Sequence, residues 1–197
     1  MENSLSSPIQ QAAFLAASSQ HSRDLLFALP TVSCGLRLDN KDVRIATGVR
    51  LCLQLCLLHR CHYGAQLDAH GRHSFVCKCA PGRTIRHNHL NELIARALSA
   101  ASISNTKEPQ GLSRSDGKLP DGLTLVSWQS GKPLIWEITL VCFLAYSCIA
   151  STAQDPSYTA EMVALNKTAK YAGLTTDYHF QPIFIETLRP ANAAITV

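Results

Sequence analysis

The stretch Lys118–Val141, KLPDGLTLVSWQSGKPLIWEITLV, predicts two β-strands joined by a tight turn. The turn signal is Ser130-Gly131-Lys132, because a glycine among polar residues interrupts the apolar pattern. Apolar side chains mark the strands on either side: Leu123, Leu125 and Val126 in the first, and Leu134, Ile135, Trp136, Ile138, Leu140 and Val141 in the second. This hairpin is therefore the predicted centre of the fold.

Two acidic residues accompany these strands, Asp121 at the start of the first and Glu137 midway along the second. A buried carboxylate costs on the order of several kcal/mol unless a partner replaces its water. An odd-numbered turn would place Asp121 opposite Thr139, with Glu137 on the same face at roughly 7–8 Å, close enough to share a divalent cation. A two-residue turn would put the two acids on opposite faces. The plainer alternative is a strand Glu paired with Arg or Lys and a turn Asp before glycine.

Composition fits a globular chain with a sizeable core. The chain has 197 residues, of which 46% are hydrophobic and 16% charged, and its net charge of +4 permits nucleic-acid binding without requiring it. The polar N-terminus lacks a signal-peptide pattern, and the longest apolar run, Ile138–Ala150, is too short to span a bilayer. We therefore expect a nuclear or cytoplasmic protein, neither secreted nor membrane-bound, whose eight cysteines stay reduced for packing or metal binding.

The N-terminal part predicts two helices and a cluster of metal-ligating residue types. A short helix is predicted over Ile9–Ala17 and a longer one over Asp39–His59, capped by Asp39 or Asn40. The segment that follows is dense in Cys and His: Cys61, His62, His70, His73, Cys77 and Cys79. Zinc takes four such ligands in a tetrahedron, so this segment is a candidate zinc site; the alternative is a degenerate loop with free thiols.

An amphipathic helix is predicted over Arg83–Ser102, with Leu90, Leu93, Ile94, Ala97, Leu98 and Ala101 on its apolar face. Asn88 is a suitable N-cap, which would place Arg86 and His87 at the positive end of the helix, where a phosphate group is favoured. The alternative is a capping segment whose basic side chains are solvated.

The remaining elements complete an alternating order. A short strand is predicted near Gly111–Arg114, a helix from Tyr158 to its end at Gly173, and a last strand over Tyr178–Thr187. The resulting order is helix, strand, strand, strand, helix, strand, which predicts an α/β (α+β) domain around a central mixed sheet.

Several motifs in a fixed order carry a resemblance to a known family. They are Cys61-His-Tyr-Gly-Ala, Asp68-Ala-His-Gly-Arg-His73, Cys77, Arg86-His87-Asn88, Pro120-Asp121 and Trp136-Glu137-Ile-Thr139. The set resembles the restriction-like PD-(D/E)XK endonuclease region at the C-terminus of target-site-specific non-LTR retrotransposon reverse transcriptases, from about Leu29 to Asn192. The resemblance implies a restriction-endonuclease-like core. It also implies an N-terminal linker over 1–33, a helix with a zinc-knuckle-like segment over 34–82, and a nuclease domain over 83–197.

The resemblance also implies the catalytic residues. Asp121 and Glu137 would hold Mg²⁺ or Mn²⁺, which activates water and neutralises phosphate charge. Thr139 occupies the usual lysine position, and the family suggests that the lysine can come from the following helix. Lys170 is slightly preferred over Lys167 for this role.

Other site residues follow from the same resemblance. Arg86 and His87 would contact a DNA phosphate, and Glu92 is a further candidate ligand for the catalytic metal. In the zinc segment, Cys61, His73 and Cys77 match the family pattern, whereas Tyr63 stands where a second Cys is expected. The fourth zinc ligand would then be His62, His70 or Cys79.

The predicted function is a metal-dependent DNA endonuclease domain of retrotransposon origin that nicks target DNA. DNA is the expected partner, with RNA through the parent element, and neither a membrane nor a small-molecule substrate is expected. The first alternative is a catalytically decayed nucleic-acid-binding module. The second is a folded domain that serves only protein contacts.

Overall fold

The structure is a computed structural model that describes residues 7–18, 22, 32–34, 37–77, 79, 81–112, 117–142, 145, 148–153 and 158–186. The chain divides into two compact units. The first covers residues 1–80, 142–159 and 186–190, and the second covers 81–141, 160–185 and 191–197. The predicted boundary at 82/83 lies next to this division, but the segment 142–159 belongs with the N-terminal unit. No helix in these described ranges is long and apolar enough to cross a bilayer.

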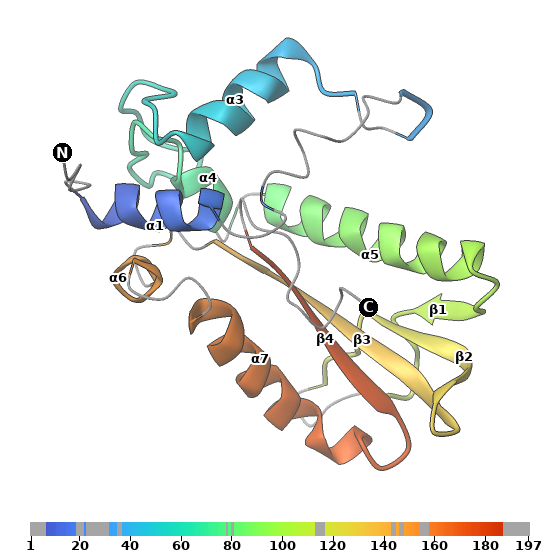
Figure 1. Ribbon diagram of the computed structural model, residues 1–197. Helices are drawn as coiled ribbons and strands as arrows, with labels where there is room; N and C mark the ends of the chain where they lie inside the picture. The colour runs from blue at the N-terminus through green and yellow to red at the C-terminus, as the bar shows by residue number, and fades with distance from the viewer. Residues whose placement is uncertain are drawn as a thin grey trace. The chain divides into compact units, whose positions relative to one another are not determined.

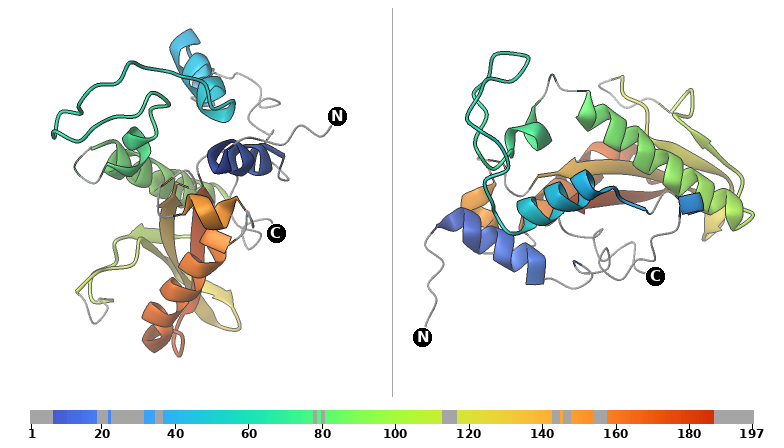
Figure 2. Two further views of the ribbon diagram at one scale, coloured as in Figure 1. Left: turned by 90° about the vertical axis from the view of Figure 1, so that its left-hand side faces the viewer. Right: turned by 90° about the horizontal axis from the view of Figure 1, so that it is seen from above.

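The first unit is mainly helical. Its elements are α1 (Pro8–Ser18), the 3₁₀ helix η1 (Val32–Cys34), α3 (Asn40–Arg50), α4 (His73–Val76) and α6 (Ile149–Thr152). Small side chains form its core: Ala12, Ala13, Ala16, Val49 and Ala153. The prediction of the first helix is confirmed, and α1 contacts α3 and α6 (Figure 2). The buried residues of α1 are all alanines, whose small side chains permit close packing.

Helix α3 is shorter than predicted. Its start is confirmed, since the Asp39 side chain accepts a hydrogen bond of 2.8 Å from the Asp42 N–H. The helix ends at Arg50 instead of continuing to His59. Beyond it Cys52 has a positive φ of 52°, the Leu53 N–H still donates to Gly48 O of the helix, and the N–H groups of Leu55 and Cys56 donate to Ala69 O instead. A tertiary backbone pairing therefore overrides the helical spacing of the apolar residues.

The second unit is a four-stranded sheet with helices. Its elements are α5 (Gly82–Ala100), β1 (Asn105–Lys107), β2 (Gly122–Gln129), β3 (Lys132–Val141), α7 (Tyr158–Tyr171), η2 (Ala172–Leu174) and β4 (His179–Glu186). The strand order is β1-β2-β3-β4, and β1, β2 and β3 are antiparallel neighbours. Strand β4 runs beside β3 in the same direction, so the sheet is mixed (Figure 1). The predicted order of helices and strands is confirmed.

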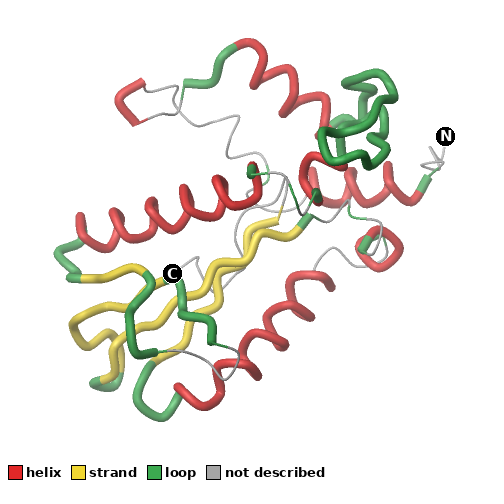
Figure 3. Tube along the Cα trace, turned by 180° about the vertical axis from the view of Figure 1, so that it is seen from behind, coloured by secondary structure: helices red, strands yellow, loops and turns green. Residues whose placement is uncertain are grey.

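The two faces of this sheet carry different residues. Trp136, Ile138 and Ile183 pack with Ala95 of α5 and form one core. The Tyr171 ring at the end of α7 stacks on Phe180 of β4 at 4.4 Å between centroids. Side chains alternate along a strand, so Glu137 points away from the α5 face that holds Trp136 and Ile138. Figure 3 shows α5 and α7 flanking the strands.

Two local predictions in this unit are wrong. The first strand is Asn105–Lys107, not the region near Gly111–Arg114, whose last two residues lie outside the described ranges. Helix α5 begins at Gly82, so Asn88 is not its N-cap and Arg86 and His87 lie inside the helix. Its most buried residues are Asn91 and Ala95, whereas Leu93 is 47% exposed. Contacts of α5 with the hairpin, described below, outweigh the local capping signal.

The hairpin turn has two residues, but its register is not regular. Ser130 and Gly131 both have positive φ, as type I′ turns require. An unbroken ladder from the Gln129–Lys132 pair would join Gly122 to Thr139, yet Gly122 pairs with Trp136. The irregularity lies between Leu123 and Gln129. There the Thr124 hydroxyl accepts a 2.9 Å hydrogen bond from the Leu134 N–H and so replaces a ladder bond.

Gly122 is required where β2 passes the Trp136 ring. A Cβ at position 122 would lie 1.9 Å from Cζ2 of Trp136, whose side chain is fully buried. We predict that Gly122→Ala lowers the free energy of unfolding by about 1–3 kcal/mol, because the overpacked strand or ring must shift. Urea unfolding followed by circular dichroism measures this change. Gly173→Ala is the matched control, since a Cβ there meets nothing within 4 Å. Equal effects of the two variants would contradict the packing argument.

Candidate functional site

Asp121 lies just before β2 begins, and its polar groups are bound by residues of two elements, α5 and β3. Its Oδ2 accepts hydrogen bonds from the Ile138 N–H at 2.6 Å and from His87 Nε2 at 3.1 Å. Its backbone carbonyl accepts a 2.9 Å bond from the Asn91 side chain. The carboxylate is largely buried, with 13% of the side chain exposed. The predicted acid of the first strand is thus fixed between α5 and β3.

Glu137 lies in the middle of β3 and is 8% exposed. Its Oε1 is 2.5 Å from Lys167 Nζ, and its Oε2 accepts a 2.8 Å hydrogen bond from the Tyr171 hydroxyl. Both partners come from α7. The buried charge is therefore paired and hydrogen-bonded, which is the condition under which such a burial is tolerated.

The register of the hairpin changes along its length. Between the Gln129–Lys132 pair and the Gly122–Trp136 pair it shifts by three residues, and Asp121 precedes the first residue of β2. The two carboxylates take their side-chain partners from different helices, His87 of α5 for Asp121 and Lys167 of α7 for Glu137. The expectation for a two-residue turn, that the two acids lie on opposite faces, stays a prediction.

Of the two candidate lysines, Lys167 contacts the site. Lys170, which the sequence slightly favoured, is exposed. The two residues are three apart on α7, so helix orientation decides between them, and that orientation is fixed by the buried Tyr171 ring, which is 1% exposed. Tyr171 itself was not predicted. Its signal in the sequence is only a large aromatic residue at the end of a helix with weak apolar periodicity.

Asn91 is a second residue that sequence reasoning missed. Its Oδ1 accepts a 2.8 Å hydrogen bond from Trp136 Nε1, and its Nδ2 donates to the carbonyl of Asp121. It is 5% exposed, in the middle of the helix face that meets the sheet. The sequence feature that could have identified Asn91 is a polar residue among the apolar positions of a helix.

Other predicted residues lie outside this contact network. Glu92 forms a surface ion pair with Lys107 at 2.5 Å, which lowers its pKa, so it is not drawn to the acidic pair. Arg86 is half-buried within α5. The Thr139 hydroxyl, at the usual lysine position, is buried and meets no hydrogen-bond partner among the described residues.

The Cys/His segment brings three predicted zinc ligands together. Cys61, His73 and Cys77 place their ligand atoms within 4.8 Å of one another. His73 and Cys77 flank a single helical turn, with the Cys77 N–H donating to His73 O at 2.9 Å, while the Cys61 backbone accepts from the Gly64 N–H at 2.8 Å. His73 Nε2 is buried without a partner in the described part of the chain. A buried acceptor beside two thiols fits a zinc-type metal ion.

The fourth ligand predicted from the sequence is not part of this group. The Tyr63 ring is 50% exposed and packs edge-on against His62. His70 uses Nδ1 for a 3.2 Å contact to Leu53 O, and Cys79 is exposed. Within the described ranges, the group that could hold a metal therefore contains three residues.

Comparisons with known proteins add no assignment. No protein-family model, curated protein or solved structure matches this chain. The features of the chain that point to a function are the two acids of the hairpin, the Cys/His group and the order of the sequence motifs.

The His87–Asp121 pair generates a pH prediction. The hydrogen bond and negative charge of Asp121 raise the pKa of His87, against the effect of burial, with smaller contributions from Asn88 and Glu137. The stabilisation is therefore fully present below about pH 6.5, the ordinary imidazole value, and is lost as the pH rises through the raised pKa. In metal-free buffer, the stability difference between wild type and His87→Gln should shrink from about pH 6 to about pH 9.

Urea titrations across this pH range measure the difference. His89→Gln is the control, since His89 lies exposed on the same helix. A stability difference for His87→Gln that does not change with pH would contradict the raised pKa.

A second prediction concerns the Cys/His group. Cys77→Ser should weaken zinc affinity well beyond the roughly 10–100-fold expected for loss of an outer-shell partner, because a thiolate ligand is removed. Competition with a chromogenic chelator measures the affinity. Cys52→Ser is the control, because Cys52 is a half-buried cysteine outside the group. Unchanged zinc affinity in Cys77→Ser would rule out this group as the zinc site.

Proposed function

We propose that the second unit is a metal-dependent DNA endonuclease domain with a restriction-endonuclease-like core. The observation that carries the proposal is a pair of largely buried acids on neighbouring parts of the hairpin: Asp121 binds the N–H of Ile138, the residue after Glu137, and Glu137 binds Lys167 of the following helix. This matches the pattern implied by the motif resemblance, in which the lysine moves from the strand to the next helix. Thr139 has no charge to offer, and Lys167 supplies it.

The acidic pair has the donor chemistry for a hard divalent cation. Carboxylate oxygens suit Mg²⁺, which usually uses one or two of them together with waters and substrate phosphate. Asp121 Oδ1 accepts no hydrogen bond from the described residues, because both donors contact Oδ2. When bound, such an ion lowers the pKa of a water and neutralises charge on the phosphate. Asp121 and Glu137 are the residues that would hold it.

The surrounding side chains have complementary tasks. The Ile138 N–H and His87 orient Asp121, and Tyr171 orients Glu137. The Lys167 ammonium provides a fixed positive charge at the site, which stabilises negative charge that develops at the phosphate. Arg86 would add a phosphate contact, which gives affinity without sequence choice. Selection of a cut site then falls to other parts of a longer protein.

A decayed nucleic-acid-binding module is the second candidate, and one observation favours it. Both oxygens of Glu137 already have partners, Lys167 and Tyr171. Across the described residues, no metal-competent group of three contains Asp121 or Glu137. In this reading the ammonium of Lys167 permanently replaces the metal charge.

Plasmid nicking tests the proposal. The purified chain should nick supercoiled plasmid with Mg²⁺ or Mn²⁺ and not with EDTA. Asp121→Asn and Lys167→Met should each lower the rate by on the order of 100-fold or more, because each removes charge at the reacting phosphate. Lys170→Met is the matched control and should retain near wild-type activity, since Lys170 is exposed on the same helix.

The other outcomes discriminate among the candidates. A folded chain that binds DNA with a strong salt dependence but never nicks it would support the decayed module instead. If the folded chain neither nicks nor binds DNA, the remaining candidate is a domain that serves only protein contacts. Equal loss in Lys167→Met and Lys170→Met would contradict the assigned role of Lys167.

A further inference from the structure

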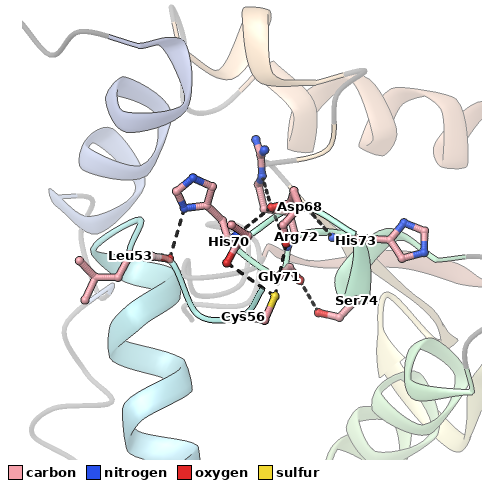
Figure 4. Close-up of polar contacts among 9 residues, drawn as sticks. Leu53, Cys56, Asp68, His70, Gly71, Arg72, His73 and Ser74 are labelled. Carbon is pink, nitrogen blue, oxygen red and sulfur yellow. Dashed lines mark hydrogen bonds and ion pairs between the residues drawn. The ribbon is translucent and has the colours of Figure 1, made fainter. Parts of the chain in front are cut away.

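The Asp68 carboxylate gathers backbone and side-chain donors next to the Cys/His group. Oδ1 accepts from the His70 N–H at 3.0 Å, the Arg72 N–H at 3.4 Å and Arg72 Nε at 3.0 Å. Oδ2 accepts from the N–H of His73 at 3.3 Å. Figure 4 shows these contacts converging from one tight turn. The Asp68 side chain therefore fixes the backbone of this turn up to His73, one of the three residues that could hold a metal ion.

The charge of Asp68 is balanced locally. Burial raises the pKa of Asp68, but hydrogen bonds and the positive charge of Arg72, with the backbone N–H groups of Arg72 and His73, hold it below its ordinary value. The Arg72 and Asp68 side chains are only 9% and 15% exposed, so this ion pair is weakly screened by water.

The same turn is held from its other side by the segment after α3. The N–H groups of Leu55 and Cys56 both donate to Ala69 O, at 2.8 and 3.1 Å. Cys56 Sγ lies 3.4 Å from Asp68 O, and His70 Nδ1 contacts the carbonyl of Leu53. These contacts use no metal ligand, so the turn is specified by the protein itself.

We propose that Asp68 is a positioning residue for the metal group of Cys61, His73 and Cys77. By binding the His73 N–H, Asp68 sets where the helical turn of α4 starts and so where the imidazole and the Cys77 thiol point. A ligand set ordered before the ion arrives binds it more tightly, because less ordering accompanies binding. This inference rests on metal binding at that group and not on the nuclease proposal.

Cobalt titration of the full chain tests the inference. Co²⁺ is a spectroscopic probe for zinc sites, and its visible bands report ligand type and geometry. Asp68→Ala should weaken Co²⁺ affinity by about 10–100-fold, the usual effect of an outer-shell partner, while the spectrum at saturation stays that of wild type. Asp68→Asn keeps one acceptor oxygen and should recover part of the affinity.

The matched control is Asp39→Ala. Asp39 also accepts a backbone hydrogen bond, at the start of α3 in the same unit, but touches no residue of the metal group. It should leave Co²⁺ affinity unchanged even if it lowers stability. Urea unfolding of each variant in EDTA separates loss of stability from loss of metal affinity.

Three results would overturn the inference. They are an unchanged Co²⁺ affinity in folded Asp68→Ala, an equal loss of Co²⁺ affinity in Asp39→Ala, and the absence of Co²⁺ binding by the wild-type chain. If Asp68→Ala does not fold, Arg72→Lys takes its place. That variant keeps the charge but loses the Nε contact to Oδ1, and it should weaken Co²⁺ binding severalfold; unchanged affinity there would equally overturn the inference.

Discussion

The second unit depends on the packing of the Trp136 ring against the backbone of Gly122. The ring is fully buried, and its indole N–H donates to Asn91, whose amide in turn donates to the Asp121 carbonyl. A single aromatic residue thus connects α5, β2 and β3. It also fixes the start of β2, where Asp121 is presented, and it lies beside Glu137 in β3. Both acids are therefore neighbours of residues in this contact: Asp121 precedes Gly122 and Glu137 follows Trp136.

The two largely buried acids of the hairpin are compensated by basic side chains. Each carboxylate has a basic partner, His87 for Asp121 and Lys167 for Glu137. Breaking such a pair costs roughly 3–5 kcal/mol, because the remaining charge is left without compensation. The same partners must share the carboxylates with any divalent cation. For the proposed nuclease, activity would depend on the affinity of these carboxylates for a metal ion in competition with the protein's own cations.

In the first unit, local contacts hold the Cys/His segment in place. It has a small alanine-rich core, and its Cys/His segment is ordered by a carboxylate, an arginine and a short backbone pairing. The ligand atoms of Cys61, His73 and Cys77 lie within 4.8 Å of one another, in a group that could hold a metal ion.

The sequence by itself determined the hairpin, the order of helices and strands in the mixed sheet, the two acids and three residues of the metal group. The hairpin follows from its two apolar runs and the glycine of the turn, whereas Cys61, His73 and Cys77 were expected from the motif resemblance. Tertiary structure decided the register shift of the hairpin, the start of α5, the end of α3 and the choice of Lys167 over Lys170. These depend on contacts between residues apart in sequence, which no local pattern encodes: Thr124 with the Leu134 N–H, Asn91 with Trp136, Ala69 with Leu55 and Cys56, and Tyr171 with Glu137.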